Sequence, residues 1–156
     1  MKFKKRTLHM KKAKKCFVTA LVLIALFSLT ACERMVSGKE KTALLAFSEP
    51  TVDNLFAGWI ASDYAVFSRD FDTDMQEEIP AANFTALKQD LDNKLGNYIS
   101  RSVDQITRQD EFYVVDYQAK FEQEEPVKIT VAFHASDHSI AFLAFDSGKV
   151  SWSTFQ

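Results

Sequence analysis

The chain changes its hydrophobic period at Gly96, and this change constrains the fold more than any other feature of the sequence. Before Gly96, apolar residues recur at helical spacing, as on one face of an amphipathic helix. After Gly96, apolar and polar residues alternate through segments rich in β-branched and aromatic residues, which is typical of strands. The sequence therefore predicts an α+β domain in which helices precede a sheet.

Three helical segments are predicted before Gly96. The first lies within residues 47–67, with Ser48 as its N-cap, Pro50 in its first turn and a break near Ser62. Its apolar face comprises Val52, Leu55, Phe56, Trp59, Ile60, Tyr64 and Phe67. A short acidic helix, "DTDMQEEI", is predicted to end at Pro80. A third helix, "NFTALKQDLDNKLG", is predicted to begin at an Asn83 cap and to end at Gly96.

Four strands are predicted after Gly96, at residues 98–107, 112–121, 127–135 and 139–145. Short, turn-like links separate them, and such links favour an antiparallel meander. A last piece, residues 150–155, extends the sheet or pairs with an edge. We therefore expect a curved antiparallel sheet of about four strands, with one face wrapped around the helices.

The N-terminal residues have the pattern of a secretory signal peptide. The first sixteen residues carry eight Lys or Arg and no acid, and residues 17–31 carry no charge. This apolar run has fifteen residues, whereas a membrane-spanning helix needs about 20. A start at Met10 in place of Met1 gives the same mature chain, so which of the two is used stays open.

The apolar run ends in Leu29-Thr30-Ala31-Cys32, which resembles the bacterial lipobox. The resemblance implies that Cys32 is the lipid attachment site and that cleavage falls between Ala31 and Cys32. The alternative is that Cys32 simply follows an ordinary signal peptide. The predicted organisation is a lipoprotein signal peptide at 1–31, a polar tether at 32–43 and the α+β domain at 44–156.

Removal of residues 1–31 changes the charge of the chain. It takes away 8 of the 19 basic residues and none of the 21 acidic ones, so the mature chain has a net charge of about −10. Such a domain is repelled by an anionic membrane and is a poor partner for nucleic acid. With Cys16 removed and Cys32 acylated, the mature chain has no thiol left for a disulfide, a metal site or a thiol enzyme.

The folded part also resembles the bacterial domain of unknown function 3887, within the nuclear-transport-factor-2-like (cystatin-like) superfamily. The resemblance covers about residues 47–148 and is carried by Asp63, Tyr64, Phe67, Phe71, Asp72, Met75, Leu91, Leu95, Gly96, Asn97 and Tyr98. It implies a cystatin-like cone with a cavity between the sheet and the long helix. The family brings no assigned chemistry, so no catalytic residue is carried over.

The implied cavity selects four aromatic residues as candidate ligand-binding side chains. Alternation along 112–121 places Tyr113 and Tyr117 on the face toward the helices, and places Asp116 on the opposite face. With Trp59 and Tyr64 from the first helix, these tyrosines would form an aromatic pocket with polar tips. The alternative is that all four are ordinary core aromatics.

Histidines and acidic residues suggest no further site. His134 and His138 flank a turn that contains Asp137, but alternation puts His134 on the polar face of its strand. The Asp70-x-Asp72-x-Asp74 run lacks the glycine that a calcium loop needs for its turn. No catalytic residue, metal or cofactor is therefore predicted.

The leading hypothesis is a lipoprotein of the bacterial cell membrane that faces outside the cytoplasm. Its domain would bind a small apolar ligand or an envelope protein. Two alternatives stay open: a cavity enzyme of the isomerase or dehydratase type, and a structural envelope protein that forms homodimers through the outer face of the sheet.

Overall fold

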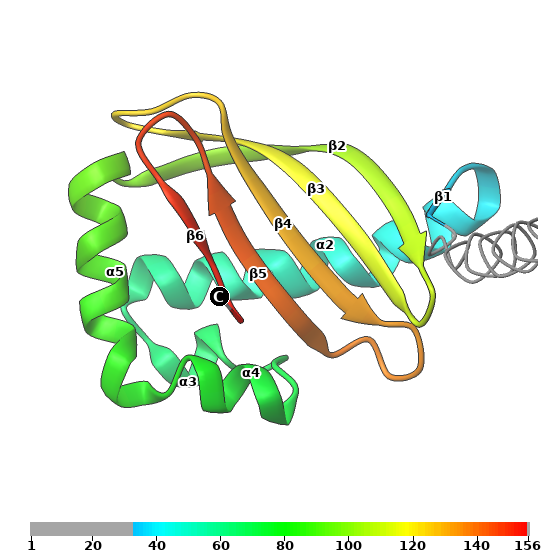
Figure 1. Cartoon of the computed structure of the whole chain (residues 1–156), viewed down its shortest axis with the longest axis horizontal. Helices are drawn as coiled ribbons and strands as arrows, with labels where there is room; N and C mark the ends of the chain where they lie inside the picture. The colour runs from blue at the N-terminus through cyan, green and yellow to red at the C-terminus, as the bar shows by residue number, and fades with distance from the viewer. Residues whose placement is uncertain (1–32, 156) are drawn as a thin grey trace, which may run out of the picture. The chain divides into compact units, whose positions relative to one another are not determined.

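The computed structural model describes residues 33–155, and these residues contain four helices followed by most of a sheet (Figure 1). The α+β class and the predicted order of elements are confirmed. The signal peptide, the cleavage site at Ala31 and the lipid attachment site at Cys32 lie outside the described residues. The helices are α2 (Gly38–Ala61), α3 (Tyr64–Phe67), α4 (Thr73–Glu78) and α5 (Ala81–Leu95).

The sheet has six antiparallel strands in the order β1-β2-β3-β4-β5-β6, where about four were predicted. The central strands are β2 (Tyr98–Gln109), β3 (Phe112–Phe121), β4 (Val127–His134) and β5 (Ile140–Asp146). The edges are β1 (Arg34–Met35), which the prediction missed, and β6 (Ser151–Ser153), which lies in the predicted last piece. Two residues are too few to show an alternating period, so β1 has no signature in the sequence.

Helix α2 begins at Gly38, ten residues before the predicted N-cap at Ser48. Ser48 is instead fully buried inside the helix, and Pro50 is also internal. An internal proline destabilises a helix by about 3 kcal/mol. The helical turns before Pro50 bury Leu44 in the core, and this burial favours the longer helix. The first turns of α2 and β1 occupy most of the segment 32–43 that was predicted as a tether. The folded domain therefore starts at residue 34 and not at residue 44.

The other helix ends lie close to the predicted positions. Helix α2 stops at Ser62, and the side chain of Asp63 accepts a hydrogen bond from the Val66 N–H to start α3. Helix α5 starts after Pro80 and not at Asn83, which lies in its first turn. Gly96 ends α5 with a φ of +77°, and a Cβ there would lie 2.8 Å from the Glu122 Cβ. Both the positive φ and the lack of space for a Cβ therefore favour glycine at this position.

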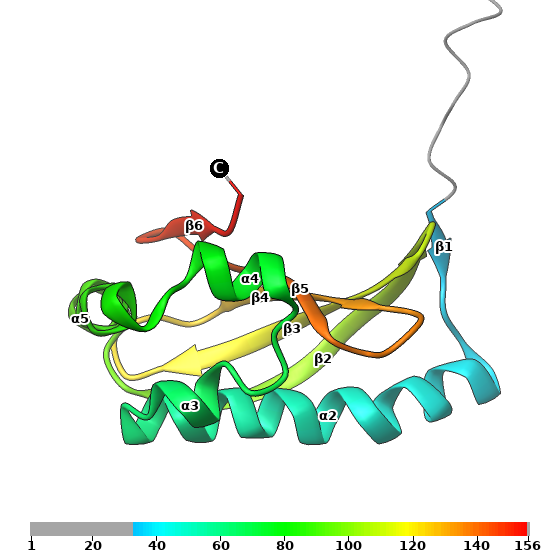
Figure 2. The same cartoon turned by 90° about the horizontal axis from the view of Figure 1, so that it is seen from below.

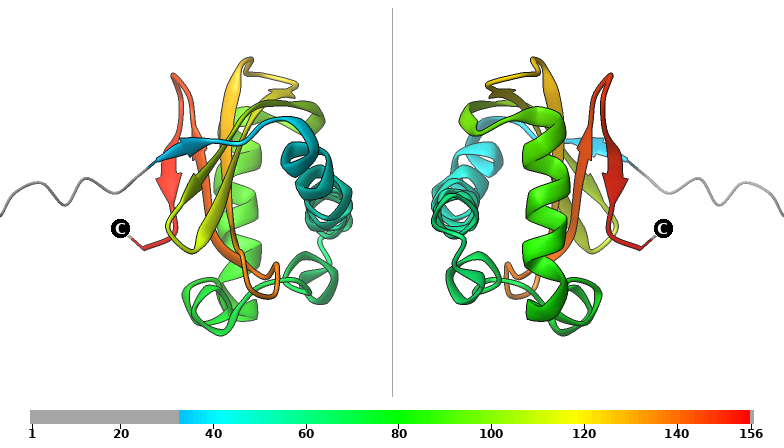
Figure 3. Two further views of the ribbon diagram at one scale, coloured as in Figure 1. Left: turned by 90° about the vertical axis from the view of Figure 1, so that its right-hand side faces the viewer. Right: turned by 90° about the vertical axis from the view of Figure 1, so that its left-hand side faces the viewer.

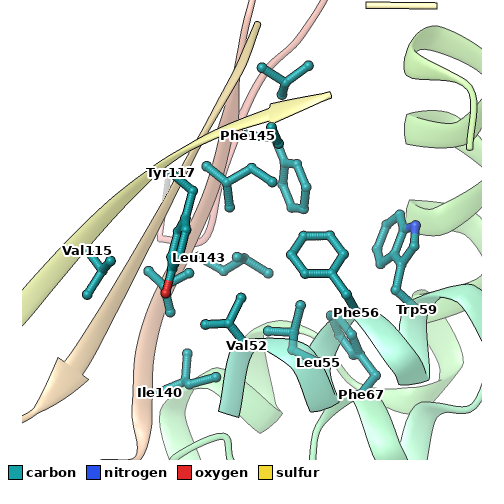
Figure 4. Close-up of a cluster of buried hydrophobic side chains, with 14 of the residues drawn as sticks. Val52, Leu55, Phe56, Trp59, Phe67, Val115, Tyr117, Ile140, Leu143 and Phe145 are labelled. Carbon is teal, nitrogen blue, oxygen red and sulfur yellow. The ribbon is translucent and has the colours of Figure 1, made fainter. Parts of the chain in front are cut away.

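Helix α2 runs along one face of the sheet, and we call this the inner face (Figures 2 and 3). Helix α5 crosses one end of the sheet, and α4 lies beside β5 (Figure 1). Side chains of α2 and of the inner face form the core (Figure 4), including Val52, Leu55, Phe56, Trp59, Val115, Leu143 and Phe145.

The strand register confirms the predicted faces of residues 112–121. Tyr117 lies opposite Val103 and Ile129 on the inner face and is fully buried. Asp116 lies opposite Gln105 and Thr130 on the outer face. A shift of one residue would have reversed both assignments.

Candidate functional site

The four aromatic residues predicted to line a cavity lie in different parts of the domain. Trp59 and Tyr64 both pack on Phe84, with ring centroids 6.0 and 5.7 Å from its own. Tyr113 and Tyr117 are four residues apart in β3, which separates them by about 13 Å along the strand. The structure therefore brings Trp59 and Tyr64 together around the Phe84 ring, whereas Tyr113 and Tyr117 lie apart.

Each of these four side chains has a hydrogen-bond partner for its polar tip within the chain. The bonds are Trp59 Nε1 to Asp92 Oδ1 at 3.3 Å, Tyr64 OH to Ile79 O at 2.8 Å, Arg108 Nη1 to Tyr113 OH at 3.4 Å, and Tyr117 OH to Glu49 Oε1 at 2.9 Å. Trp59 and Tyr117 are also fully buried. Such contacts are typical of packed aromatics whose polar atoms are satisfied inside the protein.

Charged and polar side chains surround the buried Arg101, and we call this group the Arg101 cluster. It consists of Glu49 and Asp53 from α2, Tyr98 and Arg101 from β2, and Tyr117 from β3. Glu49 and Asp53 are four residues apart, so both carboxylates project from the same side of α2. Register places Arg101 opposite Ala119 on the inner face. The helix thus presents two acids to one basic residue of the sheet.

The guanidinium of Arg101 is held from several directions, and its side chain is only 7 % exposed. Nη1 lies 2.8 Å from Asp53 Oδ1, and Nη2 donates to the Glu49 backbone oxygen at 3.2 Å. The guanidinium carbon lies 5.1 Å from the centre of the Tyr117 ring, within the range of a cation–π contact. Arg101 therefore ties α2 to β2 and β3.

Burial and neighbouring charges shift the pKa values of two members of the cluster, Tyr117 and Arg101. Burial raises the pKa of the Tyr117 phenol well above its usual value of 10, and the neighbouring Glu49 carboxylate raises this pKa further. Burial alone would lower the pKa of Arg101, but its hydrogen bonds to Tyr98 and Asp53 and the charge of Glu49 raise that pKa overall. Arg101 stays charged and Tyr117 stays neutral throughout the physiological range, so Tyr117 is not suited to proton transfer there.

Two buried side-chain polar atoms, Arg101 Nε and Ser48 Oγ, have no hydrogen-bond partner in the part of the chain that the structure describes. Arg101, Glu49 and Asp53 were not among the site residues predicted from the sequence. The available signal was a charged residue at an inward position of the alternation, two residues before Val103. A buried position of that kind requires a partner, and α2 provides two.

The histidines do not form a common site. His134 Nε2 lies 2.8 Å from Asp72 Oδ2, while Asp72 Oδ1 caps α4 at the Met75 N–H. The ring of His138 stacks on Phe47, with 3.7 Å between centroids. Asp137 instead accepts hydrogen bonds from the N–H and hydroxyl of Ser139, and these bonds lower the pKa of its carboxyl.

The outer face of the sheet carries a second buried charge, Asp116. Its carboxylate accepts hydrogen bonds from Thr130 Oγ1 at 2.6 Å and Gln105 Nε2 at 3.0 Å, and Lys128 Nζ lies 3.1 Å away. All three partners belong to β2 or β4. Asp116 thus forms a network confined to the sheet.

Residues 33–155 show neither a membrane-spanning helix nor a group of metal ligands. None of the helices there is both long enough and apolar enough to span a bilayer, and no three acidic, histidine or cysteine side chains are grouped so that they could hold a metal ion. No protein-family model, curated protein or solved structure shows a significant match to this chain.

Proposed function

We propose that the chain is a lipoprotein of a bacterial cell membrane, anchored at Cys32 and facing outside the cytoplasm, whose folded domain binds a partner. The observation that carries the proposal is the unbroken order of a basic segment, an apolar segment and the Leu29-Thr30-Ala31-Cys32 motif, directly followed by a compact domain. A thiol is the side chain to which a lipid can be attached at such a position.

The packing of the interior favours an envelope protein over a small apolar ligand as the partner. A ligand between Trp59 and Tyr117 would have to separate side chains that are fully buried. Opening a cavity in a packed core destabilises a protein by several kcal/mol, on the order of the effect of a large-to-small core substitution. We retain the cystatin-like cone and the resemblance to domain of unknown function 3887 as part of this proposal. Residues that carry the resemblance, such as Phe67, Met75, Leu91 and Leu95, lie in the core, which supports a role in the fold.

Mass spectrometry and membrane fractionation of the full chain expressed in a bacterium test the anchor. We expect a mature N-terminus at Cys32 that carries acyl chains, and a protein that sediments with membranes. Cys32→Ala should abolish acylation. Cys16→Ala is the matched control, because it removes the other cysteine and should change nothing. An unmodified Cys32 in the mature protein would refute lipid anchoring.

A second measurement separates the two kinds of partner. The purified protein is titrated with a fluorescent apolar probe, and Trp59→Phe is compared with the wild type. We expect no saturable uptake by either protein. Saturable uptake that Trp59→Phe weakens would favour the small ligand over the envelope protein.

A further inference from the structure

The fold begins very close to the anchor proposed above. Only Glu33 separates Cys32 from Arg34, the first residue of β1. Two peptide units span at most about 7 Å, which is short compared with the size of any domain. This inference rests on the proposed lipid at Cys32, because an unmodified Cys32 would place no constraint on the domain.

The first residues after the anchor are firmly attached to the domain. Arg34 pairs with Arg108 in the sheet register, and its guanidinium contacts both carboxylate oxygens of Glu40 at 2.7 and 2.9 Å. The Val36 N–H donates to the Ile106 oxygen at 2.9 Å, and the Val36 side chain is buried in the core. A flexible hinge would require these contacts to be absent. The direction of the chain at Arg34 is therefore set by the domain.

We define the anchor end as residues 33–42 and 108–111, which comprise β1, the first turn of α2 and the turn between β2 and β3 (Figure 1). Its charged residues are four basic ones, Arg34, Lys39, Lys41 and Arg108, and four acidic ones, Glu33, Glu40, Asp110 and Glu111. The rest of the mature chain has 7 basic and 17 acidic residues. The anchor end is thus neutral, and half of the net charge of −10 lies in residues 63–78, which have six acidic residues and one basic residue.

This distribution matters at a membrane surface. Bacterial membrane surfaces carry negative charge, and the repulsion acts over a Debye length of about 8 Å at physiological salt. The neutral anchor end can lie within that distance at little cost, whereas the acidic segment 63–78 cannot. Met35 adds an apolar side chain at the same end and is 60 % exposed.

We propose that the anchor end lies against the phospholipid headgroups and that the α5 end of the domain is held away from the bilayer. The short link limits how far the domain can move and brings the end that contains β1 to the lipid, and the balanced charge of that end allows it to lie there. The outer leaflet of the bilayer to which Cys32 is attached is the partner of this surface.

Quenching of a fluorescent label tests this orientation. The full chain is expressed, acylated, purified and placed in vesicles of phosphatidylethanolamine and phosphatidylglycerol that contain a headgroup quencher. Ser37→Cys labels the anchor end, and Thr85→Cys labels α5; both positions are exposed, and neither substitution changes the charge. We expect quenching severalfold stronger at position 37. Equal quenching at the two positions would overturn the proposal.

A spacer variant tests the cause. Ten Gly and Ser residues inserted between Glu33 and Arg34 lengthen the link to roughly 16–19 Å on average. Quenching at position 37 should then fall toward the value at position 85, and unchanged quenching would refute the role of the short link. The mass of each purified protein reports acylation separately. Loss of the acyl chains therefore counts against the proposed function, and loss of the quenching difference in acylated protein counts against the orientation alone.

Discussion

The two faces of the sheet each bury one charged side chain, and they neutralise it in different ways. The side chains of Arg101 on the inner face and Asp116 on the outer face are both 7 % exposed. Asp116 is satisfied by Gln105, Thr130 and Lys128, which all belong to adjacent strands. The acidic partners of Arg101 come from another layer, on α2.

This difference indicates what each buried charge specifies. The Asp116 network is complete only when β2, β3 and β4 are in their native register, so it disfavours slipped strand pairings. The Arg101 cluster is complete only when α2 sits at its native position on the sheet. It is also the less satisfied of the two, because Arg101 Nε has no partner among residues 33–155. We therefore expect the inner charge to control helix docking and the outer charge to control the sheet.

Arg101→Leu should have the largest effect. It removes the link between α2 and the sheet as well as the stacking on Tyr117, and should lower the free energy of unfolding by about 2–3 kcal/mol in urea titration. The loss of stability should be smaller than for an ion pair in which both partners are buried, because Glu49 and Asp53 keep contact with solvent. Hydrogen exchange should accelerate mainly in α2.

Asp53→Asn is the matched control for Arg101→Leu. The Asp53 side chain is 70 % exposed, so its ion pair should contribute less than about 1 kcal/mol. If Asp53→Asn destabilises the protein as much as Arg101→Leu, the buried Arg101 guanidinium is not the main link between α2 and the sheet.

Asp116→Ala should have an intermediate effect. It leaves the Thr130 hydroxyl and the Gln105 amide without their acceptor, which should cost about 1–2 kcal/mol of unfolding free energy. Lys128 is 46 % exposed and can turn to water. Faster hydrogen exchange should appear in β2–β4, with α2 unaffected. Acceleration in α2 instead would remove the distinction between the two faces.

The sequence predicted the fold well where a period extends over many residues. The strands from β2 to β5 and the faces of Tyr117 and Asp116 follow from alternation alone. The start of α2 was predicted wrongly, because Ser48 and Pro50 are local signals for the beginning of a helix. The burial of Leu44 against the core, which a local pattern does not show, outweighed them.

The Arg101 cluster could not be predicted for a related reason. Its members come from α2, β2 and β3, and Tyr117 and Glu49 are 68 positions apart. Alternation indicated that Tyr117 points inward but not which residue meets its hydroxyl. The partner depends on the rotation and axial position of α2, which side-chain packing determines.

Tyr117→Phe should have the smallest effect at neutral pH. The change removes one hydrogen bond to Glu49 Oε1 and keeps the ring that packs against Arg101. A bond to a carboxylate that is 39 % exposed should contribute about 1 kcal/mol. Urea titration at pH 7 measures the loss, and Tyr98→Phe is a control that leaves the Glu49 contact intact.

The same variant should behave differently in alkali. The pKa of Tyr117 is raised in the folded state, so the unfolded chain loses this proton first, once the pH exceeds about 10. The unfolded state then binds fewer protons than the native state, and the stability of the wild type falls by up to about 1.4 kcal/mol per pH unit from this group. Tyr117→Phe lacks this proton, so its unfolding free energy should fall less steeply and approach that of the wild type above pH 10. A difference that stays constant from pH 8 to about pH 11 would show that the Tyr117 hydroxyl is not held in its neutral form by burial beside Glu49.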